Sequence, residues 1–464
     1  MANEDSESQQ LTIEIQPKLV PIHDLTQTKW RYLFLFFDCT LCLGNYFAYD
    51  TPSVLQPEIM DRLHINSFEF NWFYSVYSFP NMILPFFGGF LSDTFGSRLA
   101  VFIFSLLVCF GQAIFALAIT IESFPIAVLG RFIFGLGGEN LCVVQGTILA
   151  EWFTGKELSM AYGMTISIGR LGSVINNILE PQFYSSTGSV VFGLWFGLFL
   201  CILSLILGLF LIFMDIHKDT LLGPSKKKSS EKIKISDIKS FNFGFWMLSG
   251  NCLVVYICVL TFNSIASLYF QTRFNFSSIE AGYFISITYI VAALFSPIFG
   301  ILADRLGRHI YWIFSSALMM LIVHVIFILL PDCDKCIWGG LNLIILGMGY
   351  SIYGSTMWGS IPFLVDSYAA GTGFGIVTAA QNTGMTIGPI IVGAIHYKTE
   401  HQYGYTYVSL FFIIVAVIGV TTASMLWVWD RKNGQHLFTA KIYDSSRLES
   451  ANEQEDLSKT LAIN

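Results

Sequence analysis

Two ionisable residues lie in the middle of strongly apolar stretches of the chain. Glu139 lies in the glycine-rich run GRFIFGLGGENLCVVQG, and Arg170 lies in ISIGRLGSVIN. A carboxylate binds an ammonium group, and the planar guanidinium of arginine binds a carboxylate through two hydrogen bonds. The two side chains therefore offer both contacts that a small zwitterion needs. The alternative is structural, an ion pair that braces two neighbouring helices.

The composition indicates that both residues lie inside a membrane. The 464 residues are 54% hydrophobic and only 12% charged, with a mean hydropathy of +0.61, whereas a soluble domain is about a quarter charged. Apolar windows of about 17–25 residues, enough to cross a bilayer, recur along the chain. Backbone groups in lipid must be satisfied internally, which makes these windows helices. The predicted spans are 30–50, 70–92, 98–120, 125–152, 158–180, 188–214, 243–271, 278–302, 308–330, 337–365, 372–396 and 404–429.

The depth of the two charges follows from these spans. At 1.5 Å per helical residue, Glu139 in the fourth span and Arg170 in the fifth both lie near the middle of the bilayer. A charge at that depth costs about 2.5–3.5 kcal/mol on insertion scales. Two charges at one depth therefore indicate a wet cavity or an ion pair.

The sequence predicts an all-α membrane protein with twelve transmembrane helices in two six-helix bundles. Its expected parts are a polar tail (1–29), an N-terminal bundle (30–214), a basic linker (215–242), a C-terminal bundle (243–430) and a second tail (431–464). Basic residues stay on the cytosolic side, so the linker and both termini are predicted to be cytosolic. The lysines of this stretch are Lys218, Lys226, Lys227, Lys228, Lys232, Lys234 and Lys239.

The two halves share local signals, which indicates an internal repeat related by a pseudo-two-fold axis. GGFLSDTFGSR after the second span matches FGILADRLGRH after the eighth, and YGMTISIGRLG matches FGIVTAAQNTG. The loop motif predicts a cytosolic latch, in which an acid favours a helix N-terminus and glycines allow close approach; the alternative is a loop that only fixes topology. The latch residues are Gly89, Asp93, Gly96 and Arg98, and in the second half Gly300, Asp304, Gly307 and Arg308.

Weaker candidates for the cavity wall follow from helical spacing. Arg170 aligns with Asn382 of the other half, so the predicted cavity is asymmetric. Asp38 lies near the cytosolic end of the first span, where we expect a gate, a proton carrier or a helix-packing residue. The remaining candidates for substrate contact are polar or aromatic: Tyr46, Tyr49, Asn263, Trp358 and Asn382.

Three further sites leave alternatives open. Arg131 is predicted to snorkel to the interface or to form structural hydrogen bonds. His324 is interpreted as a packed histidine rather than a proton relay. Cys333 and Cys336, in a short non-cytosolic loop, are predicted as a local disulfide or a free pair. No metal cluster, cofactor loop or nucleophile–base pair is recognised, so neither an enzyme, a cofactor nor a nucleic-acid partner is predicted.

The doubled loop, the twelve spans, the central linker and RFIFGLGG in the fourth span resemble the major facilitator superfamily. This resemblance implies two bundles that rock around a midplane cavity. GGENLCVVQGTILAEWFTGKELSMAYG, GNYFAYDTPSVL, and the stretch from STMWGSIPFLV through TAAQNTG are similar to the lysosomal dipeptide uniporter group of that superfamily. The closer resemblance implies export of dipeptides from lysosomes and a glycosylated accessory membrane protein on the lumenal face.

The expected function is alternating-access transport of dipeptides towards the cytosol, by facilitated diffusion. The first span lacks an E-x-x-E-R run, by which proton-coupled peptide transporters of the superfamily resemble one another. A carboxylate beside an arginine is also a poor proton carrier unless the pair separates, because the opposite charge favours its ionised form. The alternatives are proton-coupled transport of another small organic solute, with Asp38 or Glu139 carrying the proton, and a non-transporting sensor or scaffold.

Overall fold

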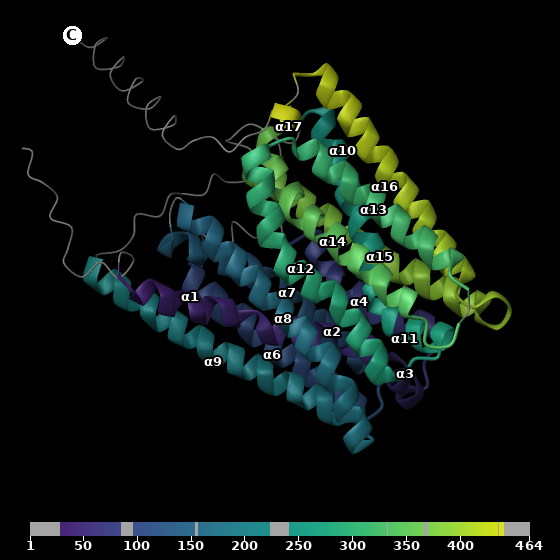
Figure 1. The fold of residues 1–464 in the computed structure, drawn as a ribbon. Coiled ribbons are helices and arrows are strands. Elements are labelled where there is room, and N and C mark those ends of the chain that lie inside the picture. The colour runs from purple at the N-terminus through teal and green to yellow at the C-terminus, as the bar shows by residue number, and fades with distance from the viewer. Residues whose placement is uncertain are drawn as a thin grey trace, which may run out of the picture.

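The computed structural model describes residues 28–84, 96–153, 156–222, 241–331, 333–365, 370–434 and 436–439, and these contain helices and no strands (Figure 1). Gly89 and Asp93 of the predicted latch, and most of the linker, lie outside the described residues. A helix occupies the described part of every one of the twelve predicted spans. The chain is an all-α membrane protein, as predicted.

The described residues of the first half form nine helical segments. The first span is divided at Cys42, and the second begins as an α-helix that continues into a 3-10 turn. The segments are α1 (Trp30–Leu41), α2 (Leu43–Val54), α3 (Gln56–Leu63), α4 (Ser67–Ser78), η2 (Phe79–Met82), α6 (Ser97–Thr120), α7 (Phe124–Trp152), α8 (Lys156–Thr187) and α9 (Val190–Leu222).

The second half has the same order of spans, and its first span carries a π-helical turn. A short terminal helix follows the last span. The segments are α10 (Phe243–Tyr256), η4 (Ile257–Thr261), α11 (Phe262–Phe274), α12 (Ser278–Leu306), α13 (His309–Leu329), α14 (Ile337–Ser360), η5 (Ile361–Phe363), α15 (Ala370–Tyr403), α16 (Thr406–Lys432) and α17 (His436–Thr439).

Seven described helical segments are long and apolar enough, taken alone, to cross a membrane. The other predicted spans are α1–α2, α4, α8, α14 and α15. These spans are broken or richer in polar residues. Two of them pack across the two bundles: α8 contacts α12, and α4 contacts α15.

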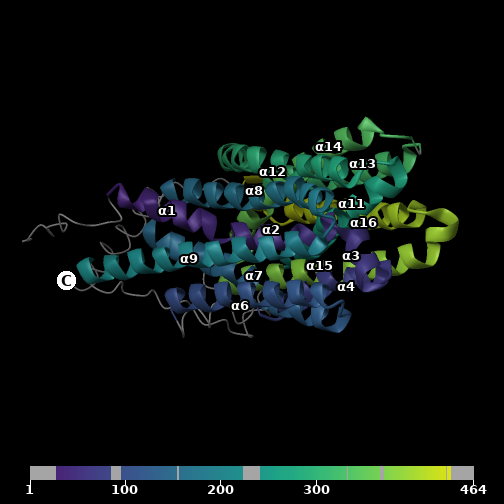
Figure 2. The ribbon, with the colours of Figure 1, turned by 90° about the horizontal axis from the view of Figure 1, so that it is seen from below.

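The two bundles meet mainly at one end. In Figure 1 they diverge towards the end where α1 begins, α9 ends and α17 lies, which we call the linker end. Figure 2 shows that the helices of both halves run roughly along one common axis. At the opposite end, Ser267 Oγ donates to Val54 O (3.1 Å) and Gln182 Nε2 donates to Tyr283 OH (3.2 Å), each across the two bundles. The opposite end is therefore the closed one.

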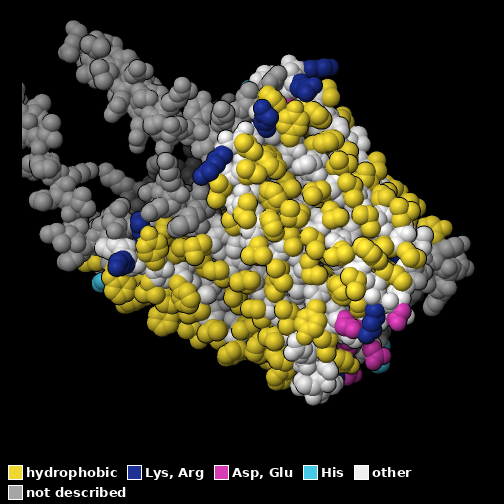
Figure 3. All heavy atoms as spheres, viewed as in Figure 1, with side chains coloured by type: hydrophobic (Ala, Val, Ile, Leu, Met, Phe, Trp, Pro, Cys, Tyr) yellow, Lys and Arg dark blue, Asp and Glu magenta, His cyan; other side chains and the backbone are white. Residues whose placement is uncertain are grey.

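The surface agrees with burial in a bilayer. On the face seen in Figure 3, hydrophobic side chains cover the flank, lysines and arginines gather towards the linker end, and acidic side chains gather at the opposite end. Phe213, Leu294 and Leu329 are among the large apolar side chains that point outward. Such an apolar belt between two polar ends is what a membrane-spanning bundle requires.

Candidate functional site

A cavity of about 340 Å³ lies between the bundles. Glu139 is near the middle of α7 and Arg170 near the middle of α8, so the cavity lies near mid-depth, as the sequence indicated. Both halves contribute to its wall. The lining residues are Asn45, Tyr46, Tyr49, Asp50, Tyr77, Glu139, Cys142, Val143, Arg170, Ser173, Tyr256, Leu260, Tyr289, Tyr350, Trp358, Thr378, Gln381 and Met385.

The glycines of α7 allow neighbouring helices to approach it closely. A methyl group at Gly137 would lie 2.7 Å from the carbonyl oxygen of Phe104 on α6, and one at Gly138 would lie 2.8 Å from Asn45 Oδ1 on α2. Larger side chains at these positions would push the helices apart. The glycine run therefore packs α7 tightly and places Glu139 at the cavity.

Arg170 is held by aromatic side chains from both bundles. Its guanidinium carbon lies 5.4 Å from the ring centre of Tyr46 and 4.8 Å from that of Tyr350, which are cation–π distances. The guanidinium also donates a hydrogen bond to Tyr350 OH. A cation that is held by rings and one neutral hydroxyl keeps donors free for an anionic ligand.

Glu139 and Arg170 share the cavity without contacting each other. Among the described residues no ion pair within 4.0 Å joins them, although both line the cavity. In this conformation they are therefore not the helix brace that was one alternative. An acid and a base are presented separately to whatever enters.

Asp50 and Tyr289 add a further polar contact between the bundles, in which Asp50 lies beside the predicted cavity residues of the first span and Tyr289 was not predicted. Tyr289 OH on α12 donates to Asp50 Oδ1 on α2 over 3.3 Å, and both residues line the cavity. Asp50 follows Tyr46 by one helical turn, so helical spacing could have placed it on the cavity face. Nothing in the second half pointed to Tyr289.

Of the weaker sequence candidates, Tyr46, Tyr49 and Trp358 line the cavity. Asn263 and Asn382 do not, and this corrects the predicted wall. The π-helical turn Ile257–Thr261 contains one more residue than an α-helical turn. It therefore rotates Asn263 away from the face that carries Tyr256.

Asn382 is fully buried, and its side chain donates to the carbonyl oxygen of Thr378 one turn earlier on α15 (3.0 Å). The residues of α15 that line the cavity are Thr378, Gln381 and Met385. These positions, at i, i+3 and i+7, share one helical face. Asn382, the residue that aligns with Arg170, lies one position after Gln381 and is therefore rotated by about 100° from the lining face.

Asp38 lies outside the cavity wall. Its side chain is fully buried, Thr165 Oγ1 donates to Asp38 Oδ2 over 3.0 Å, and Gln145 Nε2 donates to its backbone carbonyl. These contacts join α1 to α8 and α7. Asp38 therefore packs three helices of the N-terminal bundle, and its role as a gate or proton carrier stays a prediction.

Arg131 supports the cavity wall from behind. It is fully buried and donates to the carbonyl oxygens of Ala48 (3.3 Å), Tyr49 (3.2 Å) and Phe73 (3.3 Å). Pro52 lies inside α2 and has no N–H, so the Ala48 carbonyl lacks its helical donor. Of the two interpretations for Arg131, the structure shows structural hydrogen bonding rather than snorkelling.

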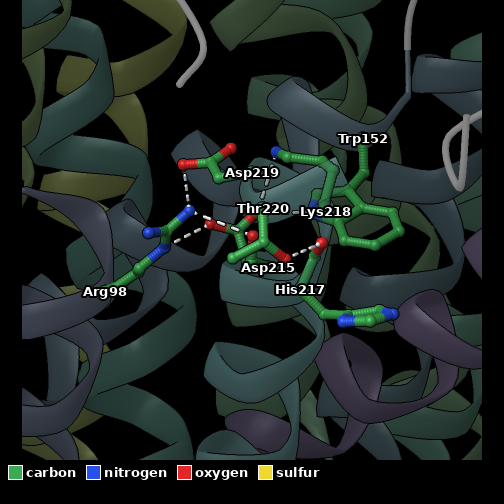
Figure 4. Close-up of polar contacts among 7 residues, drawn as sticks. All are labelled: Arg98, Trp152, Asp215, His217, Lys218, Asp219 and Thr220. Atoms are coloured by element: carbon green, nitrogen blue, oxygen red, sulfur yellow. Dashed lines mark hydrogen bonds and ion pairs between the residues drawn. The ribbon is translucent and has the colours of Figure 1, made fainter. Parts of the chain in front are cut away.

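Arg98 of the first latch motif contacts acidic residues of its own bundle (Figure 4). Arg98 Nε lies 2.6 Å from Asp215 Oδ2 on α9, and its guanidinium also contacts Asp219. Trp152 Nε1 donates to Asp215 Oδ1 over 2.7 Å, and Lys218 Nζ lies 2.8 Å from the same oxygen. This network joins the linker ends of α6, α7 and α9, and no bond crosses to the second bundle among these contacts.

The second copy shares one described backbone feature with the first. Gly96 and Gly307 both have positive φ (80° and 64°), a conformation that favours glycine. Arg308 lies over the ring of Phe438, with its guanidinium carbon 5.5 Å from the ring centre. Gly300 lies inside α12, and the side chain of Asp304 is not described.

The structure also distinguishes between the alternatives for His324 and for the pair Cys333 and Cys336. His324 is buried, with Nε2 3.1 Å from the carbonyl oxygen of Cys258 and its ring stacked on Phe412 at 4.8 Å; these are the contacts of a packed histidine. Cys333 and Cys336 form a disulfide, so of the two alternatives the structure contains the bonded one.

Comparison with known proteins places this architecture in a family. The family model of the Major Facilitator Superfamily matches residues 39–389. The chain belongs to this superfamily. A major facilitator is a membrane transporter and not an enzyme, and the two six-helix bundles seen here are the fold of that superfamily.

Particular members of the superfamily are similar over almost the whole chain. The human protein named Lysosomal dipeptide transporter MFSD1 is 34% identical over 425 residues, which cover 89% of each chain. Its counterpart from Danio rerio is 33% identical over 434 residues, 91% of this chain and 92% of that one. A crystal structure of peptide transporter POT in complex with sulfate shares the fold, with a TM-score of 0.65 at 14% identity over 87% of this chain and 96% of that one.

Proposed function

We propose that this major facilitator moves dipeptides from the lysosomal lumen to the cytosol by uniport. The observation that carries the proposal is the separate presentation of Glu139 and Arg170 on one mid-depth cavity. The relatives named Lysosomal dipeptide transporter MFSD1 support the same substrate and the same compartment.

The geometry suits a ligand with one positive and one negative end. The ammonium group of a dipeptide would bind Glu139, and its carboxylate would bind Arg170 and displace the Tyr350 hydroxyl. A cavity of about 340 Å³ lies within the range of about 300–1,000 Å³ for small-molecule sites. The rings of Tyr46, Tyr49 and Trp358 offer apolar surface, which accepts side chains of different size.

The conformation supports an alternating cycle. The bundles are bonded to each other at the opposite end and diverge at the linker end. Basic residues favour the cytosolic side, so we place the linker end and both termini in the cytosol. The structure then corresponds to the state that releases substrate to the cytosol. In the other state, we propose, the latch loops meet and the lumenal end opens.

The route is proposed to need no proton. Asp38 is enclosed by α1, α7 and α8 and does not line the cavity. We propose that the lumenal face also binds a glycosylated accessory membrane protein, as the family resemblance implies. Neither the accessory protein nor a cofactor is needed to explain the cavity itself.

Reconstituted protein in liposomes tests the proposal. We expect labelled dipeptides to equilibrate across the bilayer, while single amino acids and sugars do not, and we expect the same dipeptide flux with and without a pH gradient. Flux that stops without the gradient would show proton coupling. Flux of another solute instead of dipeptides would overturn the substrate assignment.

A further inference from the structure

Two cysteine sulfurs meet beside the cavity, and neither takes part in the proposed substrate contacts. Cys42 lies at the break between α1 and α2, Cys142 lies on α7, and their Sγ atoms are 3.2 Å apart. Cys42 is only 2% exposed, whereas Cys142 lines the cavity. One sulfur of the pair is thus reachable from the cavity, and the other is held directly behind it.

The distance between the sulfurs is close to what a covalent link requires. A disulfide has an S–S length of about 2.05 Å, so the two sulfurs must approach by only about 1 Å. Cys42 is the residue at which the helical run of the first span is interrupted, with φ −94° and ψ 0°. A residue at such a break can shift at lower cost than one inside a continuous helix.

We propose that Cys42 and Cys142 form a redox-sensitive pair, which hydrogen peroxide converts into a disulfide. The Cys142 sulfur, as its thiolate, attacks one peroxide oxygen; the O–O bond breaks, and the departing hydroxide takes up the thiol proton as water. Cys142 is then a sulfenic acid. The Cys42 sulfur attacks the Cys142 sulfur, the S–O bond breaks, and the hydroxide leaves with the Cys42 proton as a second water. Two thiols have been oxidised and one peroxide has been reduced to two waters.

Proximity makes the second step favoured over further oxidation of Cys142. A positioned partner converts a bimolecular reaction into an effectively unimolecular one. The other free cysteines named near the first span have different neighbours: Cys39 Sγ lies 3.5 Å from Thr165 Oγ1, and Cys201 Sγ lies 3.4 Å from the carbonyl oxygen of Gly44. Cys42 is therefore the resolving thiol that the geometry selects for Cys142.

The link would act on the cavity through the adjacent turns. Tyr46 follows Cys42 by one turn, Glu139 precedes Cys142 by one turn, and Tyr46 OH lies 3.8 Å from Cys142 Sγ. Oxidation removes the thiol hydrogen next to Tyr46 and draws α7 towards the first span. Tyr46 also supports the Arg170 guanidinium, so both ends of the proposed dipeptide site are displaced. This consequence rests on the proposed function, whereas the cross-link itself does not.

Mass spectrometry of the full-length protein in liposomes tests the cross-link. After treatment with hydrogen peroxide, alkylation and digestion, we expect a peptide pair joined through Cys42 and Cys142, which dithiothreitol separates. The pair should also form in Cys39→Ala, the control, and Cys42→Ala should instead carry oxidised Cys142 alone. If peroxide leaves both thiols free in the wild-type protein, or oxidises Cys142 without joining it to Cys42, the proposal is overturned.

Dipeptide uptake in the same liposomes tests the effect on transport. Because a misplacement of about 1 Å can cost up to about 10²-fold in a positioned site, we expect peroxide to lower wild-type uptake by about tenfold and dithiothreitol to restore it. The double variant Cys42→Ala with Cys142→Ala, which has neither thiol, should show the same uptake before and after peroxide. Unchanged uptake in cross-linked protein would overturn the effect on transport. If the reduced protein moves no dipeptide at all, the proposed function fails, while the peptide analysis still decides the cysteine pair.

Discussion

Arg170 donates a hydrogen bond to the phenol oxygen of Tyr350, and this bond joins α8 of the first bundle to α14 of the second through the cavity. The same guanidinium lies over the rings of Tyr350 and Tyr46. In a ligand-free cavity the tyrosine hydroxyl thus occupies a position that a ligand carboxylate would take. Substrate binding and the contact between the bundles are therefore expected to compete for one side chain.

Arg170→Lys should abolish most transport, although it keeps the positive charge. Lysine is a point charge without the planar pair of donors that binds a carboxylate through two hydrogen bonds. Because the loss of a charge-assisted hydrogen bond costs about 1.5–3 kcal/mol, we expect dipeptide uptake to fall by about tenfold or more. Arg305→Lys, at the exposed linker end of α12, is the matched control. Wild-type uptake by Arg170→Lys would show that the guanidinium does not contact substrate.

Tyr350→Phe should bind substrate more tightly. The variant keeps the aromatic ring over Arg170 but removes the hydroxyl that competes with the ligand carboxylate. A neutral hydrogen bond contributes about 1 kcal/mol, so the KM for dipeptide uptake should fall by about fivefold. Tyr353→Phe, whose hydroxyl donates to Asn251 away from the cavity (2.9 Å), serves as the comparison. A higher KM in Tyr350→Phe would mean that the hydroxyl contacts the substrate itself.

Sequence patterns predicted the architecture well because the distribution of apolar residues reflects whether lipid or water surrounds each segment. Apolar windows reflect the lipid around each span, and the doubled loop motif reflects a repeated turn, since Gly96 and Gly307 both adopt positive φ. The mid-depth placement of Glu139 and Arg170 followed from counting residues along straight helices. These properties are local, and a single sequence contains them.

The wall of the cavity could be predicted only where its helices are regular. The π-helical turn before Asn263 and the rotation of Asn382 away from the cavity depend on packing between helices, which no local pattern reports. The separation of Glu139 from Arg170 is a property of one conformation of the two bundles. The Cys42–Cys142 contact joins residues 100 positions apart, and two apolar spans give no sign of such a pairing.

Neighbouring residues on α15 provide a test of the corrected cavity face. Gln381 lines the cavity, whereas Asn382 is turned onto its own helix. Gln381→Ala should raise the KM for dipeptides by about threefold to tenfold, the value of about one hydrogen bond, while Asn382→Ala should change it by less than about twofold. Uptake kinetics at several dipeptide concentrations measure both values. The opposite ranking would restore Asn382 to the site.

Asp215→Asn should lower the stability of the protein more than Asp219→Asn. Asp215 is 2% exposed and contacts Arg98, Trp152 and Lys218, and Lys218 is itself only 4% exposed. Breaking a buried pair costs about 3–5 kcal/mol, because one charge is left uncompensated, whereas a more exposed pair contributes about 0–1 kcal/mol. Melting of the detergent-solubilised variants, followed by intrinsic fluorescence, should show the larger decrease for Asp215→Asn. Equal melting temperatures would argue against a structural role for the network in Figure 4.

Arg131→Leu should destabilise the first bundle without removing any proposed substrate contact. The substitution leaves the carbonyl oxygens of Ala48, Tyr49 and Phe73 without their donor, and the Ala48 carbonyl has no helical donor to return to, because Pro52 follows it by four residues. Counted for the Ala48 carbonyl alone, at about 1.5–3 kcal/mol for a hydrogen bond to a charged donor and about 2–4 °C per kcal/mol, the melting temperature should fall by roughly 3–12 °C. Arg131→Lys should recover only part of this loss, since an ammonium group cannot reach three carbonyls in one plane. A double variant, Arg131→Leu with Pro52→Ala, restores the backbone N–H at position 52 and should melt above Arg131→Leu alone. If Pro52→Ala gives no recovery, the arginine does not act by satisfying the carbonyl that the proline leaves free.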